Sequence, residues 1–374
     1  MIDMDAWFDC LARAGVTFYS GVPCSFLKGM FAYLPQSTLP YVPATIEGEA
    51  LSMAAGAALG GGLGAVLLQN SGLGNTINPL TSLLMPYKLP AVMIISWRAQ
   101  PGLKDAPHHE PMGRLTLPLL ETLEVPYLVL SDAAGWPQQV HALIAQAQTE
   151  RRPVAIIVPK DTLGAYPKPA PTSPHSSEHT PHQHFGEPQG LALTRQALLE
   201  AWAQLPWANF ATTGHTGRHL YMIDDQPRRF YMQGSMGFAS AVALGWQRAT
   251  DQPLVVFDGD GALMMRMGNL ATVGARHHGA AFVHLVLDNQ AYGSTGGQAV
   301  PNALCDFAAI ARACGYRHTA TCDDARFLEQ SIRWARSNEG ATLIHYRISP
   351  SASSALPRPS MRPDALASRF MMWR

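Results

Sequence analysis

A chain of 374 residues exceeds one typical domain, so we expect two domains of roughly 150 to 180 residues each. Its 27 lysines and arginines balance 27 aspartates and glutamates, and neither a basic run nor an interleaved aromatic patch is present, which argues against a nucleic-acid partner. Hydrophobic residues make up 47% of the chain and charged residues 14%, so we expect much of the surface to be buried against another subunit.

The apolar segments are too short to span a membrane, and we expect neither a membrane anchor nor a signal peptide. The five cysteines are odd in number and lack a CxxC pair, which favours the reducing cytoplasm.

The first half alternates strand-like and helix-like runs, as parallel α/β domains do. Strands are predicted over 17–20, 65–69, 91–96, 127–130 and 153–158, and helices over 3–14, 47–59, 75–85, 115–123 and 133–149. The glycine run 60–64 follows a helix and precedes a strand, whereas dinucleotide binding needs the reverse order. This run therefore predicts a helix end, and a nicotinamide oxidoreductase is disfavoured.

The segment 166–189 is dense in Pro, Ser and His and predicts a linker. The irregular spacing of its histidines favours a solvated segment over a metal site; these are His175, His179, His182 and His184. The alternation then resumes, with strands predicted over 210–213, 254–257, 281–287, 318–321 and 342–346. We therefore predict an α/β fold with two doubly wound parallel-sheet domains, over 1–165 and 190–349, and a tail over 350–374 that is irregular or docked on a neighbour.

The most informative motif is Gly259-Asp260-Gly261, at the end of a predicted strand and before a helix. Such a turn offers free N–H groups to a phosphate, but a carboxylate there repels phosphate unless a cation lies between them. Mg²⁺ prefers the oxygen ligands that Asp260 and the Asn289 amide supply. The pair therefore indicates a metal-bridged diphosphate site; the alternative is an N-cap at Asp260 and an ordinary turn at Asn289.

The spacing of the two motifs supports this interpretation. One crossover, a helix over 263–276 and a strand over 281–287, separates them, so both strand ends emerge at the same edge of a parallel sheet. Ligands bind at that edge in open α/β sheets. A Gly-Asp-Gly motif followed about thirty residues later by Asp-Asn resembles the thiamine-diphosphate signature.

Three further strings fit this cofactor. Glu47, where an apolar helix begins, is the candidate carboxylate for the pyrimidine ring, although an acid also suits any first helical turn. In Gly234-Ser235-Met236 the Met236 side chain could wedge between the two rings of a bent cofactor and the Gly234 carbonyl could accept a hydrogen bond, although this string also suits a helix start. Thr213 and Gly214 offer a hydroxyl and an N–H group to the diphosphate.

Together these motifs resemble the thiamine-diphosphate-dependent decarboxylases, in the short two-domain form that includes the phosphonopyruvate and sulfopyruvate decarboxylases. The likeness covers about 21–298. It implies a pyrimidine-binding domain over 1–165, a diphosphate-binding domain over 190–349, activation of the cofactor by Glu47, and Mg²⁺ held by Asp260, Asn289 and the Ala291 carbonyl. The cofactor site is then completed by Thr213, Gly214, Gly234, Ser235, Met236, Gly259, Gly261 and Ala262.

The strings 21–25, 69–75 and 294–298 resemble the phosphonopyruvate decarboxylases, and the double glycine in the last favours them over the sulfonate enzymes. This resemblance predicts that Ser25, Asn70, Ser294 and Thr295 bind substrate. One departure is Cys24, which stands where many relatives have Asp.

The loop 97–114 gathers cations in a chain that is otherwise sparing with charge, and we expect Arg98 and Lys104 to bind an anionic substrate. The pair His108-His109 resembles the paired histidines that transfer protons in larger pyruvate decarboxylases. The alternative is that this loop is polar because it is exposed.

The resemblance implies decarboxylation of 3-phosphonopyruvate to phosphonoacetaldehyde and CO₂ in phosphonate biosynthesis, with thiamine diphosphate and Mg²⁺. The alternatives are a sulfopyruvate decarboxylase, a carboligase or transferase that uses a related 2-oxo acid, and a non-catalytic regulator. It also implies at least a homodimer, in which Glu47 and Asp260 of different chains serve one active site.

Overall fold

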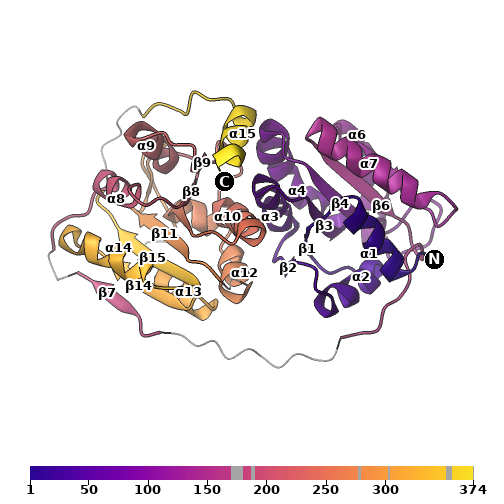
Figure 1. Cartoon of the computed structure of the whole chain (residues 1–374), viewed down its shortest axis with the longest axis horizontal. Helices are drawn as coiled ribbons and strands as arrows, with labels where there is room; N and C mark the ends of the chain where they lie inside the picture. Colours follow the sequence, from indigo (N-terminus) through magenta and orange to yellow (C-terminus); the bar gives the residue numbers. More distant parts are fainter. Residues whose placement is uncertain (170–179, 187–189, 277–278, 302–303, 351–355, 374) are drawn as a thin grey trace. The chain divides into compact units, whose positions relative to one another are not determined.

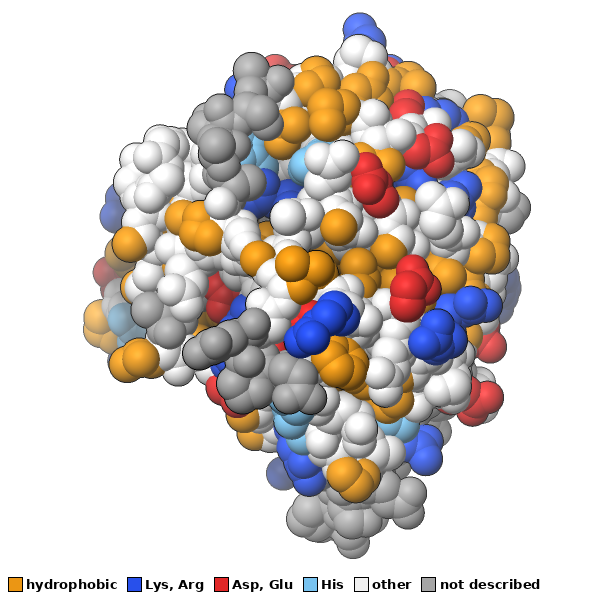
Figure 2. All heavy atoms as spheres, turned by 90° about the vertical axis from the view of Figure 1, so that its left-hand side faces the viewer, with side chains coloured by type: hydrophobic (Ala, Val, Ile, Leu, Met, Phe, Trp, Pro, Cys, Tyr) orange, Lys and Arg blue, Asp and Glu red, His pale blue; other side chains and the backbone are white. Residues whose placement is uncertain are grey.

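The computed structural model describes residues 1–374 except 170–179, 187–189, 277–278, 302–303, 351–355 and 374. The chain divides into two compact units, Met1–Pro174 and His175–Arg374, which are coloured indigo to magenta and pink to yellow in Figure 1. Within the described parts of the chain, no helix has the length and apolar character that a membrane crossing needs. On the face shown in Figure 2, basic and acidic side chains are interspersed.

The first unit is built on a six-stranded sheet in which every pair of neighbours is parallel. Its strands, in spatial order, are β2 (Tyr41–Pro43), β1 (Phe18–Gly21), β3 (Gly64–Gln69), β4 (Ala91–Ser96), β6 (Pro153–Val158) and β5 (Tyr127–Val129). All six residues of β4 and of β6 are buried, as expected for central strands covered on both faces.

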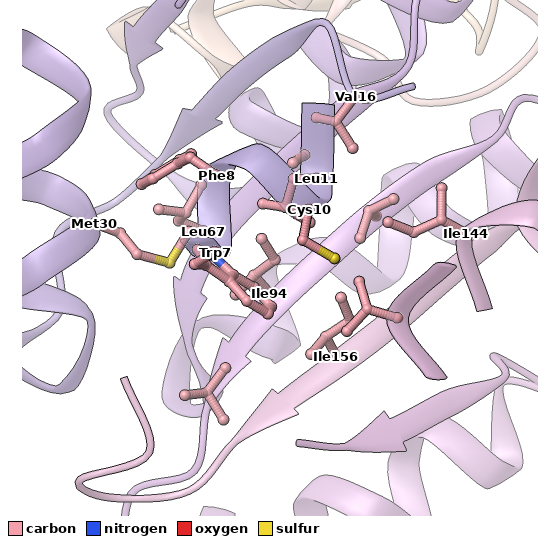
Figure 3. Close-up of a cluster of buried hydrophobic side chains, with 14 of the residues drawn as sticks. Trp7, Phe8, Cys10, Leu11, Val16, Met30, Leu67, Ile94, Ile144 and Ile156 are labelled. Atoms are coloured by element: carbon pink, nitrogen blue, oxygen red, sulfur yellow. The ribbon is translucent and has the colours of Figure 1, made fainter. Parts of the chain in front are cut away.

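One face of this sheet carries α1 (Met4–Arg13), α2 (Lys28–Tyr33) and α7 (Trp136–Glu150). Asp3 caps α1, because its carboxylate accepts from the N–H groups of Asp5 and Ala6. Figure 3 shows Trp7 and Leu11 of α1 against Ile94 and Ile156 of the sheet. The remaining helices of the unit are α3 (Glu47–Leu59), α4 (Leu73–Pro79), the π-helical turn Leu80–Leu84, α5 (Met85–Tyr87) and α6 (Glu110–Thr122).

The second unit has a seven-stranded sheet, also parallel throughout. Its order is β7 (Gln183–Phe185), β14 (His318–Cys322), β15 (Ala341–Arg347), β11 (Phe282–Asp288), β10 (Leu254–Gly259), β8 (Ala208–Ala211) and β9 (Arg229–Tyr231). A separate antiparallel pair joins β12 (Ala291–Tyr292) and β13 (Gln298–Ala299). The helices are α8 (Arg195–Trp202), α9 (His215–Ile223), α10 (Ala239–Thr250), α11 (Asp260–Met265), α12 (Gly268–Arg276), α13 (Phe307–Ala313), α14 (Leu328–Arg336) and α15 (Pro363–Trp373).

These two parallel α/β sheets confirm the predicted fold class, and several predicted elements match closely. Helix α3 and strands β4 and β6 have the predicted bounds. The glycine run after α3 is a helix end, since Gly61 adopts a φ of +85° there.

Three segments differ from the sequence expectations. The segment predicted as a linker, 166–189, contributes β7 to the edge of the second sheet through pairing with β14. The tail predicted as irregular or docked on a neighbour, 350–374, ends in α15, because Phe370 packs among the rings of Phe210, Phe230 and Trp246. The single helix predicted over 263–276 is two helices, α11 and α12.

Both units follow the same topology. Taking the six strands of the first sheet in chain order, their spatial order is 2-1-3-4-6-5, and β8, β9, β10, β11, β14 and β15 repeat that order in the second sheet. In each unit the second strand lies on one side of the first strand and the third strand lies on the other side. The strand order therefore reverses between β1 and β3 in the first unit and between β8 and β10 in the second. Such switch points are where open α/β sheets bind ligands.

Candidate active site

A pocket lies at the switch point of the second unit, where the loops after β8, β10 and β11 meet. Predicted cofactor residues from all three loops line it, namely Thr213, Gly214, Gly259, Asp260, Gly261, Ala262, Asn289 and Ala291. Met236 and Ser294 also line this pocket. Strands β10 and β11 are direct neighbours with Gly259 opposite Leu287, so the two motifs emerge at one edge, as the sequence predicted.

Asp260 is the buried carboxylate of this pocket. One of its oxygens accepts from the N–H of Gly261 at 2.8 Å and the other from the N–H of Gln290 at 2.9 Å. Burial and the adjacent carboxyl of Asp288 raise the pKa of Asp260 to about 7. Burial is the largest single influence on the pKa of Asp288 and acts to raise it, but the hydrogen bonds with His345, at 2.9 Å, with Asp260 and with the Gln290 N–H, together with the charge of His345, outweigh burial and hold that pKa low.

The residues present fit a diphosphate bridged by a divalent cation. Two buried carboxyl groups lie side by side at Asp260 and Asp288, so a cation beside Asp260 would relieve the unfavourable burial of negative charge. The carboxylate, the Asn289 amide and the Ala291 carbonyl are oxygen donors of the kind that Mg²⁺ takes. The N-terminus of α9 follows Gly214 at the same pocket and supplies N–H groups for an anion.

Two residues that the sequence reasoning missed line the same pocket, Arg195 and His215. Arg195 is 7% exposed; burial lowers the pKa of its guanidinium and the charge of Asp260 acts against that shift. Burial and the charges of Arg195 and Arg218 lower the pKa of His215. Nothing in the local sequence marks Arg195, because it begins a helix that precedes β8 and is brought to the pocket only by the fold.

The string Gly234-Ser235-Met236 forms the turn between β9 and α10. Ser235 is buried with a φ of +51°, and Gly237 has a φ of +90°, so this short turn reverses sharply before the helix. Thr295, predicted to bind substrate, does not line the pocket, and its hydroxyl donates to the Tyr292 carbonyl at 3.2 Å and to Gln298 at 3.0 Å.

In the first unit, Glu47 is the first residue of α3 and is partly exposed. Its Oε2 accepts from the Asn75 amide at 2.8 Å, while its Oε1 lies over Gly72, where an added Cβ would come within 2.1 Å of it. Glu49 has a structural role, because its Oε2 accepts from the N–H and the hydroxyl of Thr45 at 2.7 Å each. Glu49 thereby fixes the turn that leads into α3 and Glu47.

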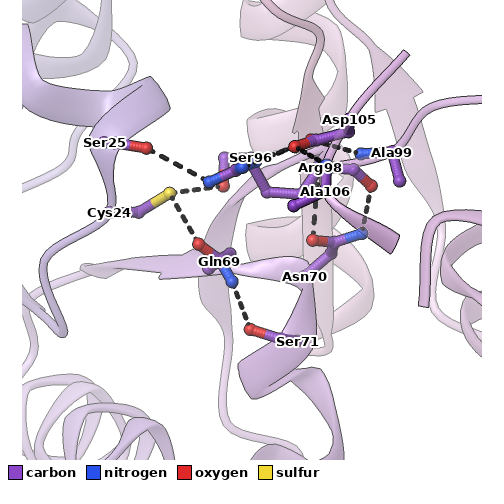
Figure 4. Close-up of polar contacts among 10 residues, drawn as sticks. All are labelled: Cys24, Ser25, Gln69, Asn70, Ser71, Ser96, Arg98, Ala99, Asp105 and Ala106. Carbon is purple, nitrogen blue, oxygen red and sulfur yellow. Dashed lines mark hydrogen bonds and ion pairs between the residues drawn. The ribbon is translucent and has the colours of Figure 1, made fainter. Parts of the chain in front are cut away.

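A second polar cluster lies at the switch point of the first unit (Figure 4). Arg98 forms a two-point ion pair with Asp105, at 2.7 and 2.5 Å, and donates to the Ser25 hydroxyl at 3.3 Å. The guanidinium also lies 4.5 Å from the ring centroid of Phe26. The hydrogen bonds from Arg98 hold the pKa of Asp105 well below its usual range. Cys24 joins the cluster, with its sulfur 3.0 Å from the Ser96 hydroxyl and 3.4 Å from Gln69 Oε1.

Asn70, predicted to bind substrate, is fully buried. Its amide nitrogen donates to the Arg98 carbonyl and to the Thr116 hydroxyl, both at 3.0 Å, and its oxygen accepts from the Arg98 N–H at 3.2 Å. Asn70 therefore braces the backbone of Arg98. Lys104, the other cation predicted to bind substrate, is exposed on the same loop.

The rings of His108 and His109 lie 4.0 Å apart, at the start of α6. His109 is buried, and burial together with the charges of Arg98 and His108 lowers its pKa. A neutral imidazole near neutral pH suits proton transfer. In the predicted linker, His182 lies 3.2 Å from the Thr319 hydroxyl and His184 lies 3.7 Å from Asp323, while His175 and His179 fall outside the described residues.

Comparison with known proteins agrees with this geometry. The family "Thiamine pyrophosphate enzyme, N-terminal TPP binding domain" matches residues 4–115, and "Thiamine pyrophosphate enzyme, C-terminal TPP binding domain" matches residues 212–346. A solved thiamine-diphosphate-dependent 4-hydroxybenzoylformate decarboxylase from Rhodococcus jostii superimposes with a TM-score of 0.71 at 16% identity, over 93% of this chain and 99% of that one. At this identity the likeness establishes the fold.

Curated relatives are closer in sequence. The chain is 42% identical to a phosphonopyruvate decarboxylase from Streptomyces hygroscopicus, over 96% of this chain and 91% of the relative. It is 41% identical to the enzyme of that name from Streptomyces viridochromogenes, over 96% and 92%. It is 26% identical to a sulfopyruvate decarboxylase from Methanosarcina acetivorans, over 97% and 95%. The chain therefore belongs to the thiamine-diphosphate-dependent decarboxylases, the family that its motifs resemble.

Proposed function

We propose that this protein decarboxylates 3-phosphonopyruvate to phosphonoacetaldehyde and CO₂, with thiamine diphosphate and Mg²⁺, as a step in phosphonate biosynthesis. The observation that carries this proposal is the identity of 42% and 41% to two phosphonopyruvate decarboxylases over 96% of the chain. The pocket around Asp260 supports it, because this pocket offers the donors that a metal-bound diphosphate needs.

In the proposed site, Asp260, Asn289 and the Ala291 carbonyl hold the cation, while Thr213, Gly214 and the N-terminus of α9 hold the diphosphate. Arg195 adds a positive charge beside the diphosphate. Thiamine diphosphate, when bound, supplies a carbon nucleophile and accepts the electron pair that CO₂ leaves behind.

The first unit supplies the proton-transfer groups in this proposal. Glu47 activates the cofactor through its pyrimidine ring, and its carboxylate is held ready by Asn75 and by the space over Gly72. His109, with its lowered pKa, is the group that exchanges protons with the substrate. In this proposal, Ser25 and Arg98 form a polar wall beside His109.

We propose a homodimer or larger homo-oligomer in which the first unit of one chain and the second unit of another complete each site. A composition of 47% hydrophobic and only 14% charged residues supports this assembly. We propose the cytoplasm as its compartment, because all five cysteines are free thiols.

Sulfopyruvate decarboxylation is the second candidate, since one such enzyme is 26% identical over 97% of the chain. The two substrates differ in the group on the methylene carbon: a phosphonate, like a phosphate, carries about −1.5 to −2 charges near pH 7, whereas a sulfonate carries a single charge. The higher identity to the phosphonate enzymes favours the first candidate.

The direct test is incubation of the purified protein, with thiamine diphosphate and Mg²⁺, with 3-phosphonopyruvate, 3-sulfopyruvate or pyruvate. We expect ³¹P NMR to show phosphonoacetaldehyde in step with CO₂ release, and turnover of sulfopyruvate at least tenfold slower. Faster turnover of sulfopyruvate would support the second candidate, and a carbon–carbon coupled product in place of the aldehyde would identify a carboligase.

A further inference from the structure

The charge of a phosphonate must be met inside the protein, and the first unit does not meet it fully. Arg98, the cation that the sequence singled out, already forms a two-point ion pair with Asp105, and the side chains of the two are only 16% and 11% exposed. The pair is neutral overall, so it offers N–H groups rather than a net positive charge. The cations that balance a phosphonate must therefore come from elsewhere.

A cavity of about 290 Å³ in the second unit carries such cations. It is bounded by the loop after β8, the side of α9, the end of β9 and the segment that precedes α15; the residues that matter are Thr213, Gly214, Arg218, Tyr231, Gln233 and Arg358. Thr213 and Gly214 also line the pocket around Asp260, so the two cavities share these two residues of the loop after β8.

The charge of this cavity is uncompensated. None of its lining residues is acidic, and neither Arg218 nor Arg358 has an ion-pair partner among the described residues. The nearby carboxylates are committed elsewhere: Asp225 is held by both terminal nitrogens of Arg369 at 2.7 Å, and Asp224 pairs with Arg229 at 3.1 Å. Arg218, which is partly exposed, and Arg358, which is exposed, thus line a cavity that has no acidic residue in its wall.

The segment that bears Arg358 is tied to the unit. The Ser360 hydroxyl lies 2.9 Å from the Tyr221 hydroxyl, and Gln233 donates to the Met361 carbonyl at 3.2 Å. Beyond them, α15 anchors the chain through the buried Phe370. These contacts of the C-terminal segment therefore hold Arg358 at the cavity.

We propose that this cavity is the phosphonate subsite, in which Arg218 and Arg358 bind the phosphonate oxygens of the substrate. The proposal rests on the proposed function. Guanidinium groups match the oxygens of a phosphonate by two-point hydrogen bonding, and two of them balance a dianion. The carboxylate of the substrate is the wrong group for this site, because two cations would stabilise it in the ground state and oppose its loss as CO₂.

The test uses the holoenzyme and a probe that needs no turnover, phosphonoacetate, with malonate as the matched ligand in which a carboxylate replaces the phosphonate. Calorimetry on the wild type, Arg218→Gln and Arg358→Gln measures the affinity for each ligand and, separately, for thiamine diphosphate with Mg²⁺. We expect each variant to bind phosphonoacetate about tenfold to 100-fold more weakly and to lose less affinity for malonate, whose carboxylate carries a single charge, with the affinity for thiamine diphosphate within threefold of wild type.

Arg248→Gln is the control, because Arg248 is an exposed arginine at the end of α10 and does not line the cavity. This variant should bind phosphonoacetate as the wild type does. The Lys variants at 218 and 358 keep the charge and should retain part of the affinity.

Three results would overturn the subsite. They are wild-type affinity for phosphonoacetate in both Gln variants, a matching loss in Arg248→Gln, and a tenfold loss of thiamine diphosphate affinity, which would assign the cavity to the cofactor. Failure of the proposed function is a separate result: the wild type would bind phosphonoacetate through both arginines and yet release no CO₂ from 3-phosphonopyruvate.

Discussion

The two units share one strand order, yet the charged groups at their switch points differ. The first has an arginine paired with a carboxylate, and the second has two neighbouring carboxyl groups. After the third strand of the sheet, the first unit has Asn70, a buried neutral amide, and the second has Asp260, a buried carboxyl. After the fourth strand the first unit has Arg98 with its partner Asp105, and the fourth strand of the second unit ends at Asp288, beside Asp260. The topology positions the loops, and the residues on them decide what each edge can bind.

The polar groups at the first switch point satisfy one another. Arg98 is paired with Asp105, and both N–H groups of the buried Asn70 amide are hydrogen-bonded. The second switch point is incomplete, because burial and Asp288 raise the pKa of Asp260 to about 7. An edge that buries two neighbouring carboxyl groups is stabilised by a cation. This difference supports our proposal that the second unit binds the metal and the diphosphate and that the first unit supplies the proton-transfer groups.

Glu47→Gln should have the largest effect, because it removes the carboxylate that we propose activates the cofactor and leaves the rest of the site intact. We expect the turnover number to fall about 10³-fold, with the affinity for thiamine diphosphate within threefold of wild type. Steady-state kinetics and calorimetry on the holoenzyme measure the two quantities. Equal losses in turnover and in cofactor affinity would show that Glu47 holds the cofactor instead of activating it.

Asp260→Asn should come next, because it removes the charge on which the second switch point depends. We expect the affinity for thiamine diphosphate in the presence of Mg²⁺ to fall at least about 100-fold. Mutating a residue that only hydrogen-bonds a metal ligand can already lower metal affinity by about 100-fold, and Asp260 is a proposed ligand. Asp251→Asn, at the exposed end of α10, is the control and should bind as the wild type does. Unchanged binding by Asp260→Asn would break the proposed division of labour between the units.

The sequence predicted the parts of this comparison that depend on local pattern. The start of α3 at Glu47 and the shared edge of Gly259 and Asp288 follow from hydrophobic runs and from the crossover rule. Strands β2 and β9 were not predicted: each has three residues, too few to show a period, whereas the equally short β5 lies in the apolar run 127–130. Helix α15 was hidden behind Pro- and Ser-rich sequence, and its anchor Phe370 is specified only by rings from β8, β9 and α10.

The site residues divide in the same way. Asp260 was predicted from the Gly-Asp-Gly motif, whereas Arg195 reaches the pocket only through the packing of α8. Arg98 was found as a cation, but its neutralisation by Asp105 depends on the path of the loop between them. Sequence spacing gives the strand ends, and it does not give partners whose meeting requires the tertiary fold.

Arg195→Gln should have a smaller effect than either acid variant, because in the proposed site it removes one charge-assisted contact to the diphosphate and leaves the metal-binding residues unchanged. We expect the affinity for thiamine diphosphate to fall about tenfold, equivalent to about 1.4 kcal/mol, with the turnover number at saturating cofactor within threefold of wild type. Calorimetry measures the first quantity and kinetics the second. Wild-type cofactor affinity in this variant would confine Arg195 to a packing role.

Asp105→Asn should have the smallest effect of these variants, and we expect it to act on the stability of the fold. The reason is that Asp105 forms its ion pair with Arg98, within the first unit. The hydrogen bonds from Arg98 lower the pKa of Asp105 below its unfolded value, so its contribution is complete above about pH 4 and is lost as the pH falls through the lower folded pKa. We expect Asp105→Asn to cost about 1.5 kcal/mol of unfolding free energy at pH 7 by denaturant titration, and this difference should shrink below pH 4. Asp9→Asn breaks an exposed ion pair with Arg13, at 3.6 Å, and should cost less than about 0.5 kcal/mol. A difference for Asp105→Asn that persists unchanged at pH 3 would mean that shape, and not the charge of the pair with Arg98, holds this edge of the first unit together.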